Sequence, residues 1–385
     1  MSFRIKYATQ LIEDDDKAAV LKAMDSENLT QGKFVNLFED ALCSYTKSKY
    51  CSVVANASVA LKLAYMALDV KPGDIVWIAN NTFASTATSA LSCGARVVPI
   101  EISLDTFNFD VSKLKLMLDV AKNKKCLPKV VTVVDFGGLP SASLELHNLS
   151  KKYGFRVIID SAHGIGSKIG AEPTGANTYS DITVFSFHAI KVITTGEGGA
   201  LTTNDPELAS KFSSLRSHGI RAASHRSEQE KKGELWNYDV FNLGYNFRLT
   251  DIQSALGLSQ LKKLDRFVNI RHDLMKTYEN NLASRFELQK VHSGFHSAYH
   301  LNAVLLPKNM RMNKRDIFCR FAEKSIQLNY HYIPINRLKF IEKVNGKTNM
   351  VRSNEYFRRA ITLPLHQKLS HEDIKEICGE LNKCK

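Results

Sequence analysis

A single lysine, Lys191, stands between a β-rich run at residues 185–187 and a turn of small residues at 194–199, within the segment FSFHAIKVITTGEGG. Glycines let a backbone approach a ligand closely. A lysine whose pKa is lowered can form a Schiff base with a carbonyl carbon. Most lysines are solvated surface residues, but this neighbourhood is a poor place for a charge that serves only solubility. Lys191 is therefore a candidate amine catalyst.

Two further features could bind a cofactor beside that amine. Asp160 ends the apolar run VIID, and a buried carboxylate must be paired or hydrogen-bonded to stay charged. It could cap the following turn, or it could hold a pyridinium nitrogen protonated, which makes the ring an electron sink. The segment ANASVAL at 55–61 places small residues at an expected helix start, which can bind phosphate, although an Asn or Ser there can simply cap its own helix.

Apolar strands alternate with helical patterns, such as 58–68 and 85–94, through the first half of the chain. Such alternation predicts a parallel sheet covered on both faces, with functional groups at the carboxyl ends of the strands. Asp135, Asp160 and His188 fall at such ends. The expected strands are residues 51–55, 74–79, 95–102, 129–136, 155–162, 181–188 and 200–205.

The second half of the chain has a different pattern. Residues 251–282 predict one long helix, followed by a mixed α+β tail that contains the apolar segments 300–306, 329–335 and 361–365. We expect a large α/β domain with an N-terminal arm at residues 1–250 and a smaller domain at 251–385.

Composition and charge exclude several classes of function. The net charge is +13 over 385 residues, but the basic residues are dispersed and lack interleaved aromatics, so we expect an anionic small substrate and no nucleic acid. No apolar run is long enough for a membrane span, and the start lacks a signal-peptide core, so we expect a cytoplasmic protein. The seven cysteines show no C-x-x-C spacing, which argues against a disulfide framework and a metal site.

Motifs along almost the whole chain together resemble the DegT/DnrJ/EryC1/StrS family of sugar aminotransferases. The resemblance implies a pyridoxal-phosphate (PLP) enzyme of the aspartate aminotransferase fold (fold type I), with a mostly parallel central sheet and a smaller C-terminal α+β domain. It also implies a homodimer with shared active sites. The motifs are LTQGKFVNLFEDAL, NTFASTA, DSAHGIG, FSFHAIKVITTGEGG, RSHGI, GYNFRLTDIQSALGLSQLKKLD, HYIPI and LPLH.

The resemblance also assigns roles to individual residues. Lys191 would form the Schiff base and shuttle a proton, Asp160 would pair with the pyridine nitrogen, and His163 would lie near the phenolic oxygen of the ring. Phe83 would stack on the ring. The phosphate would be held by Asn56, Ala57, Ser58 and Ser186, and by Asn246 from the partner subunit. Possible substrate contacts are His188, Arg248 and Lys33. Each of these residues could instead have an ordinary structural role, in the core, in a helix cap or in a turn.

The motifs LTQGK, FSFHAIK and ALGLSQLKKLD are similar to a subgroup that uses glutamate to aminate C-4 of a UDP-linked 4-keto-6-deoxy-N-acetylhexosamine for pseudaminic-acid-type glycans. Three positions depart from the usual pattern: Asn56 replaces a hydroxyl residue, Val192 a proline and Asn336 a histidine. Another nucleotide 4-keto sugar, such as a UDP-pentose, therefore stays open as the substrate. Sugar dehydratases of the family carry histidine in place of the lysine, which Lys191 argues against. A nucleic-acid-binding regulator on an idle scaffold is the alternative from another class.

Overall fold

A computed structural model describes residues 3–141, 143–220, 233–234, 236 and 238–384. Its centre is a seven-stranded sheet in which only β9 runs antiparallel to its neighbours. All seven expected strand segments lie in this sheet, so the mostly parallel α/β architecture is confirmed. The strands, in spatial order, are β1 (Tyr50–Val54), β9 (Gly199–Thr203), β8 (Ile182–Ser186), β5 (Arg156–Asp160), β4 (Val130–Val134), β2 (Ile75–Ala79) and β3 (Arg96–Ile100).

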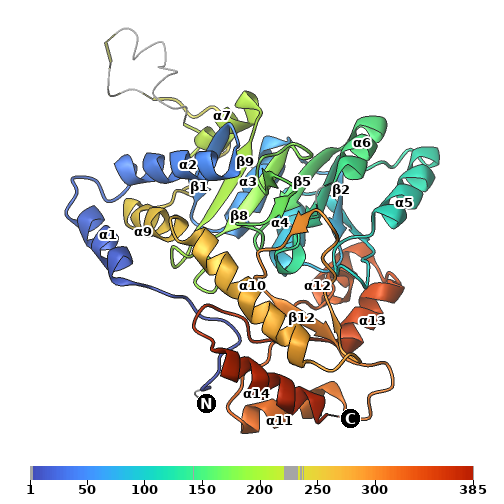
Figure 1. Ribbon diagram of the computed structural model, residues 1–385. Coiled ribbons are helices and arrows are strands. Elements are labelled where there is room, and N and C mark those ends of the chain that lie inside the picture. Colours follow the sequence, from blue (N-terminus) through green and yellow to red (C-terminus); the bar gives the residue numbers. More distant parts are fainter. Residues whose placement is uncertain (1–2, 142, 221–232, 235, 237, 385) are drawn as a thin grey trace.

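Helices cover both faces of the sheet (Figure 1). Alternate residues of β2 show this: Val76 and Ile78 pack into the core beneath α3 (Ala57–Ala67), α4 (Ala84–Ser92) and α7 (Pro206–Leu215). Trp77 and Ala79 face the opposite core, beneath α5 (Val111–Asn123) and α6 (Leu144–Tyr153). Burial on both sides explains why the strands read as continuous apolar runs.

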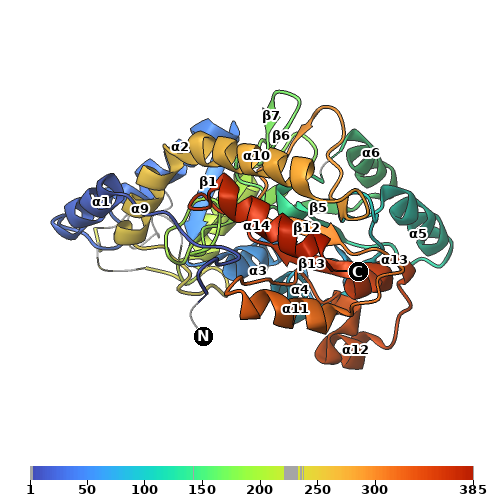
Figure 2. The same cartoon turned by 60° about the horizontal axis from the view of Figure 1, so that its bottom comes forward.

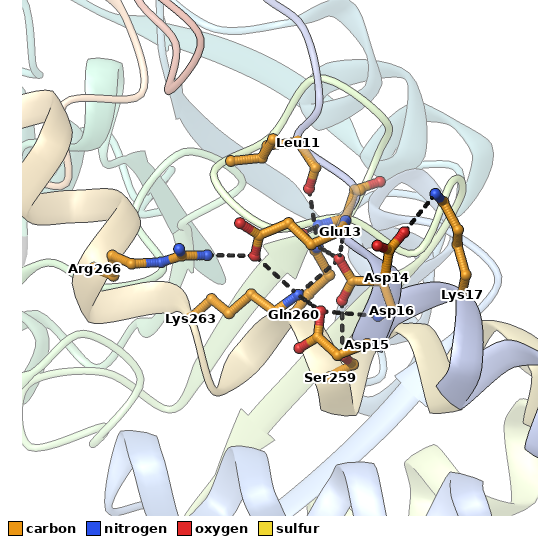
Figure 3. Close-up of polar contacts among 11 residues, drawn as sticks. Leu11, Glu13, Asp14, Asp15, Asp16, Lys17, Ser259, Gln260, Lys263 and Arg266 are labelled. Carbon is orange, nitrogen blue, oxygen red and sulfur yellow. Dashed lines mark hydrogen bonds and ion pairs between the residues drawn. The ribbon is translucent and has the colours of Figure 1, made fainter.

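The expected helix over 251–282 is in fact two helices, α9 (Asp251–Leu261) and α10 (Leu264–Asn281). At the break, Lys263 turns its ammonium group to an acidic cluster at the start of α1 (Asp14–Met24), where Nζ lies 2.5 Å from Asp15 and 2.8 Å from Asp16 (Figure 3). Glu13 lies 3.2 Å from the same nitrogen. Periodicity in the sequence cannot reveal such a break, because residues far away in the chain supply the ion pairs.

The C-terminal part contains the three-stranded sheet β10 (Glu287–Leu288), β12 (Asn302–Leu305) and β13 (Ala360–Leu363). Figure 2 shows α14 (His371–Asn382) between α10 and α11 (Lys314–Glu323). Among the described residues, the remaining α-helices and strands are α2 (Lys33–Thr46), α12 (Lys339–Asn345), α13 (Val351–Arg359), and a small sheet of β6 (Lys168–Ile169), β7 (Glu172–Pro173) and β11 (Phe295–His296).

Helix α10 belongs to two cores. Phe267 and Val268 pack with Phe38 of α2, whereas Leu274 and Tyr278 pack in the C-terminal core. The division into domains at residue 250 therefore stays a prediction. None of the helices in the described part of the chain is long and apolar enough to cross a membrane.

Candidate active site

A cavity of about 750 Å³ opens where the carboxyl ends of β4, β5 and β8 meet the N-terminus of α3. This is the edge of a parallel sheet at which ligands bind, and the volume suits a cofactor and a substrate together. The structure brings most of the residues predicted from the sequence to this cavity: Asn56, Ala57, Ser58, Phe83, Asp160, His163, Ser186, His188 and Lys191.

Lys191 lies in a loop that closes on the end of β8. The backbone of Phe187 accepts a hydrogen bond from the amide of Thr195 and donates one to Gly198, so the two arms of the loop are tied together. Lys191 is partly buried beside the cavity, and burial lowers the pKa of its amine to about 8, although the carboxylate of Asp160 opposes the shift. A substantial fraction of this amine is therefore neutral near pH 8, as a nucleophile requires.

Asp160 is the last residue of β5 and is 4% exposed. Its Oδ2 accepts a hydrogen bond of 2.7 Å from the Thr86 hydroxyl, and its Oδ1 one of 3.2 Å from the amide of Ala162. Burial raises the pKa of the carboxyl, while these donors and Lys191 oppose the shift. No ion pair among the described residues includes Asp160. The carboxylate therefore offers an unneutralised charge to a cationic group in the cavity.

The N-terminus of α3 forms the floor of the site. The side chain of Asn56 accepts a hydrogen bond of 3.0 Å from the amide of Val59, so it caps the helix and leaves its NH₂ group for a ligand. Gly199 of β9 packs against this turn: a Cβ there would lie 2.6 Å from the carbonyl carbon of Asn56 and 2.7 Å from the amide of Ala57. The free amides of a helix start, held this closely, are suited to phosphate.

His163 lies in the wall of the cavity with both ring nitrogens engaged. Nδ1 accepts a hydrogen bond of 3.3 Å from the amide of Gly137, and Nε2 lies 2.9 Å from the hydroxyl of Tyr332. Burial, with the nearby Lys191, keeps the pKa of the imidazole well below its ordinary value. His163 is therefore neutral and held in one tautomer.

Three of the predicted residues do not line this cavity. Asn246 forms a bridge with Ser217. Lys33 begins α2, with its Nζ 5.5 Å from the ring centroid of Phe34. Arg248 lines a separate cavity of about 530 Å³ between α2 and the end of α7.

Sequence reasoning missed several residues of the site. Thr86 and Tyr332 lie within the motifs NTFASTA and HYIPI, so the motifs pointed to their segments but not to their contacts. Tyr7, Glu197 and His331 also line the cavity. The carboxylate of Glu197 lies 3.8 Å from the His188 ring. Tyr7 comes from the N-terminal arm, and no motif in the sequence pointed to it.

The donor set fits PLP. It combines a buried carboxylate that lacks an ion pair, a helix N-terminus pressed against a glycine, and a lysine with a lowered pKa. These groups match a ring nitrogen that carries a proton, a phosphate and an aldehyde carbon. No group of three or more His, Cys, Asp or Glu that could hold a metal occurs among the residues that the structure describes.

Residues 10–382 match the model of the DegT/DnrJ/EryC1/StrS aminotransferase family. The chain is 37% identical over 373 residues to a UDP-4-amino-4,6-dideoxy-N-acetyl-beta-L-altrosamine transaminase of Campylobacter jejuni, which covers 96% of this chain and 95% of the relative.

Solved structures with a similar fold include two sugar aminotransferases, one of them putative. Helicobacter pylori PseC, an aminotransferase involved in the biosynthesis of pseudoaminic acid, superposes with a TM-score of 0.90 at 29% identity, over 100% of this chain and 99% of that one. The PLP form of a putative sugar aminotransferase from Streptococcus pneumoniae superposes with a TM-score of 0.87 at 25% identity, over 100% and 98% of the two chains.

Proposed function

The chain belongs to the DegT/DnrJ/EryC1/StrS aminotransferase family and is a PLP-dependent enzyme of fold type I; from this premise we propose its substrate. We propose that it transfers an amino group from L-glutamate to C-4 of a UDP-linked 4-keto-6-deoxy-N-acetylhexosamine, for a pseudaminic-acid-type surface glycan. The observation that carries the proposal is the end-to-end similarity to altrosamine transaminases.

When bound, PLP supplies a carbon that exchanges amino groups and a protonated ring that accepts electrons. We infer that Asp160 keeps a proton at the ring nitrogen and that Lys191 Nζ takes and returns a proton during the amino transfer. Phe83 would flank the ring. The phosphate would be bound by Asn56, Ala57, Ser58 and Ser186.

The positive charge of the protein favours binding of the proposed UDP-sugar substrate. A UDP-sugar carries a diphosphate, and the net charge of +13 favours its approach. His188 lies at the cavity and can contact the sugar. Arg248 and Lys33, which lie outside the cavity of their own chain, would contact the UDP-sugar from a partner subunit.

We therefore also propose a cytoplasmic homodimer with shared active sites. Large apolar side chains in the segment that precedes Asn246 are exposed in the single chain, with Trp236 78% and Leu243 77% exposed. Exposed apolar surface is typical of interfaces where it forms a patch. Asn246 of the partner subunit would then complete the phosphate site.

Mixing two inactive variants tests the shared site. Lys191→Ala and Asn246→Ala protomers, allowed to exchange subunits, should regain activity of roughly a quarter of the parental value. About half of the dimers are hybrid, and one of the two sites in each hybrid is intact. Arg248→Ala is the second partner to use if Asn246→Ala keeps too much activity. No recovery despite demonstrated subunit exchange would place both residues in the same chain's site.

The substrate is tested by product analysis. The purified enzyme is incubated with glutamate, or with glutamine in parallel, and a panel of UDP- and GDP-linked 4-keto sugars, and the products are analysed by mass spectrometry. We expect the UDP-linked 4-keto-6-deoxy-N-acetylhexosamine to be aminated with the highest kcat/KM. Preference for a UDP-4-keto-pentose, or for glutamine over glutamate, would correct the substrate or the donor. Salt-sensitive DNA retention without bound cofactor would favour the regulatory alternative.

A further inference from the structure

The wall of the cavity carries a phenol, Tyr332, to which the family resemblance assigns no role. It lies in the extended segment between α11 and α12, and it lines the same cavity as Lys191 and Asp160. Its hydroxyl is the partner of the His163 ring. The question is which of the two groups donates the proton in that bond.

The backbone amide of Gly137 determines the direction of the hydrogen bond between His163 and Tyr332. The amide of Gly137 can only donate, so the Nδ1 of His163 that it contacts must be the acceptor. A neutral imidazole with an accepting Nδ1 carries its proton on Nε2. Nε2 therefore donates to the Tyr332 oxygen at 2.9 Å. The hydroxyl proton of Tyr332 is left to point elsewhere.

The position of the Tyr332 ring is tightly constrained. Its backbone amide donates to the side chain of Asn81 at 3.2 Å. Phe136 packs edge-on against the ring with centroids 6.3 Å apart, and Phe83 lies on its cavity side at 5.7 Å. Burial raises the pKa of the phenol, so it stays protonated and acts as a donor. Among the described residues, no acceptor within hydrogen-bond distance takes that proton.

Building on the proposed function, we propose that the Tyr332 hydroxyl is a catalytic hydrogen-bond donor to an oxygen of the bound cofactor or keto-sugar, and that His163 is the residue that orients it. The family resemblance places His163 itself against the phenolic oxygen of the cofactor. In this chain the single proton of His163 is already donated to Tyr332. The phenol therefore takes the contact with the ligand, and the imidazole acts through it.

The test uses the holoenzyme and Tyr332→Phe, which removes only the hydroxyl. The pH dependence of the absorbance of the bound cofactor, near 400–430 nm (roughly), is measured without substrate, and kcat is measured with keto-sugar. A donor to a cofactor oxygen stabilises negative charge there, so its loss should move the pH of the absorbance change upward by about one unit. If the acceptor is the keto-sugar oxygen, that pH stays the same and kcat falls at least about tenfold.

Two sets of control variants test whether the effect is specific to the Tyr332 hydroxyl. Tyr356→Phe removes a buried hydroxyl that donates to the backbone of His331 at 2.6 Å, outside the cavity; it should lower stability and leave the cofactor spectrum unchanged. His163→Phe should reproduce part of the Tyr332→Phe effect, and the double variant should resemble Tyr332→Phe alone, because the imidazole acts through the phenol.

The proposal is overturned if Tyr332→Phe changes neither the absorbance transition nor kcat. It is equally overturned if Tyr356→Phe gives the same shift, or if the effects of His163→Phe and Tyr332→Phe add fully. Failure of the parent protein to bind PLP or to aminate any keto-sugar would instead reject the proposed function. The two failures are therefore distinguishable.

Discussion

Two of the groups of buried charge among the described residues are built in opposite ways. In the cluster of Figure 3, Asp16 is fully buried but accepts bonds from Ser259, Gln260 and Lys263. Burial alone would raise the pKa of Asp16, but the amide of Glu13 and these side chains hold it below its usual value. The pKa of Lys263 is raised by its carboxylate partners, against the effect of burial. Every charged side chain in this cluster therefore lies within ion-pair distance of at least one opposite charge.

At the cavity, burial and not ion pairing determines the direction of the pKa shifts of the charged groups. Burial raises the pKa of Asp160 and lowers that of Lys191, and no ion pair among the described residues joins the two. Burying these two groups without an ion pair costs free energy of folding. The paired cluster therefore attaches the N-terminal arm to the rest of the fold, whereas the unpaired groups are available to a ligand.

The largest effect on activity should come from Lys191→Ala. Loss of the amine removes the group that binds the cofactor carbon and moves the proton, so kcat should fall by at least about 10⁴-fold. The thermal midpoint of the protein without cofactor should not fall, because an unpaired buried charge is removed. Activity assays and calorimetry check both points. Activity close to that of the parent would contradict the assignment.

Asp160→Asn should lower kcat by about 10³-fold, because an amide cannot hold the ring nitrogen protonated. Asp135→Asn is the matched control. Asp135 is a buried carboxylate at the end of the neighbouring strand, but it is bonded to Ser141 and Ser161 and does not line the cavity. This control should lose stability and keep the cofactor spectrum. A spectrum of Asp160→Asn that also equals the parent's would make Asp160 a structural residue.

The smallest effect on catalysis should come from the paired cluster. Asp16→Asn should lower the free energy of unfolding by about 2–3 kcal/mol, because charged hydrogen bonds from Lys263 and Gln260 are weakened, while kcat of the folded enzyme stays within about twofold. Urea unfolding and steady-state kinetics measure the two. A large loss of kcat with unchanged stability would erase the contrast between the clusters.

The pH dependence of this variant has a definite sign. The folded pKa of Asp16 is lowered, so the stability it contributes is present above its unfolded pKa of about 3.9 and is lost as pH falls through the folded value. The difference in unfolding free energy between parent and Asp16→Asn should therefore shrink below about pH 4. A difference that grows on acidification would contradict the pairing.

The central sheet could be predicted from the sequence because each strand is buried on both faces and reads as a short apolar run. Lys191, Asp160 and the start of α3 could be found because they lie at strand or helix ends beside glycines and small residues. The break at Lys263 could not, since the acidic cluster that pairs with it is at the other end of the chain. Tyr332 was missed for a similar reason: its contact with His163 joins segments 169 residues apart, and only the tertiary fold brings them together.

The most direct measurement of the central claim is chemical. The holoenzyme is reduced with borohydride, digested with trypsin and analysed by mass spectrometry. We expect one phosphopyridoxyl group, on a peptide of residues 169–211 left uncut at Lys191. The same label on another lysine, or no label on an enzyme that still transfers amino groups, would contradict the assignment of Lys191.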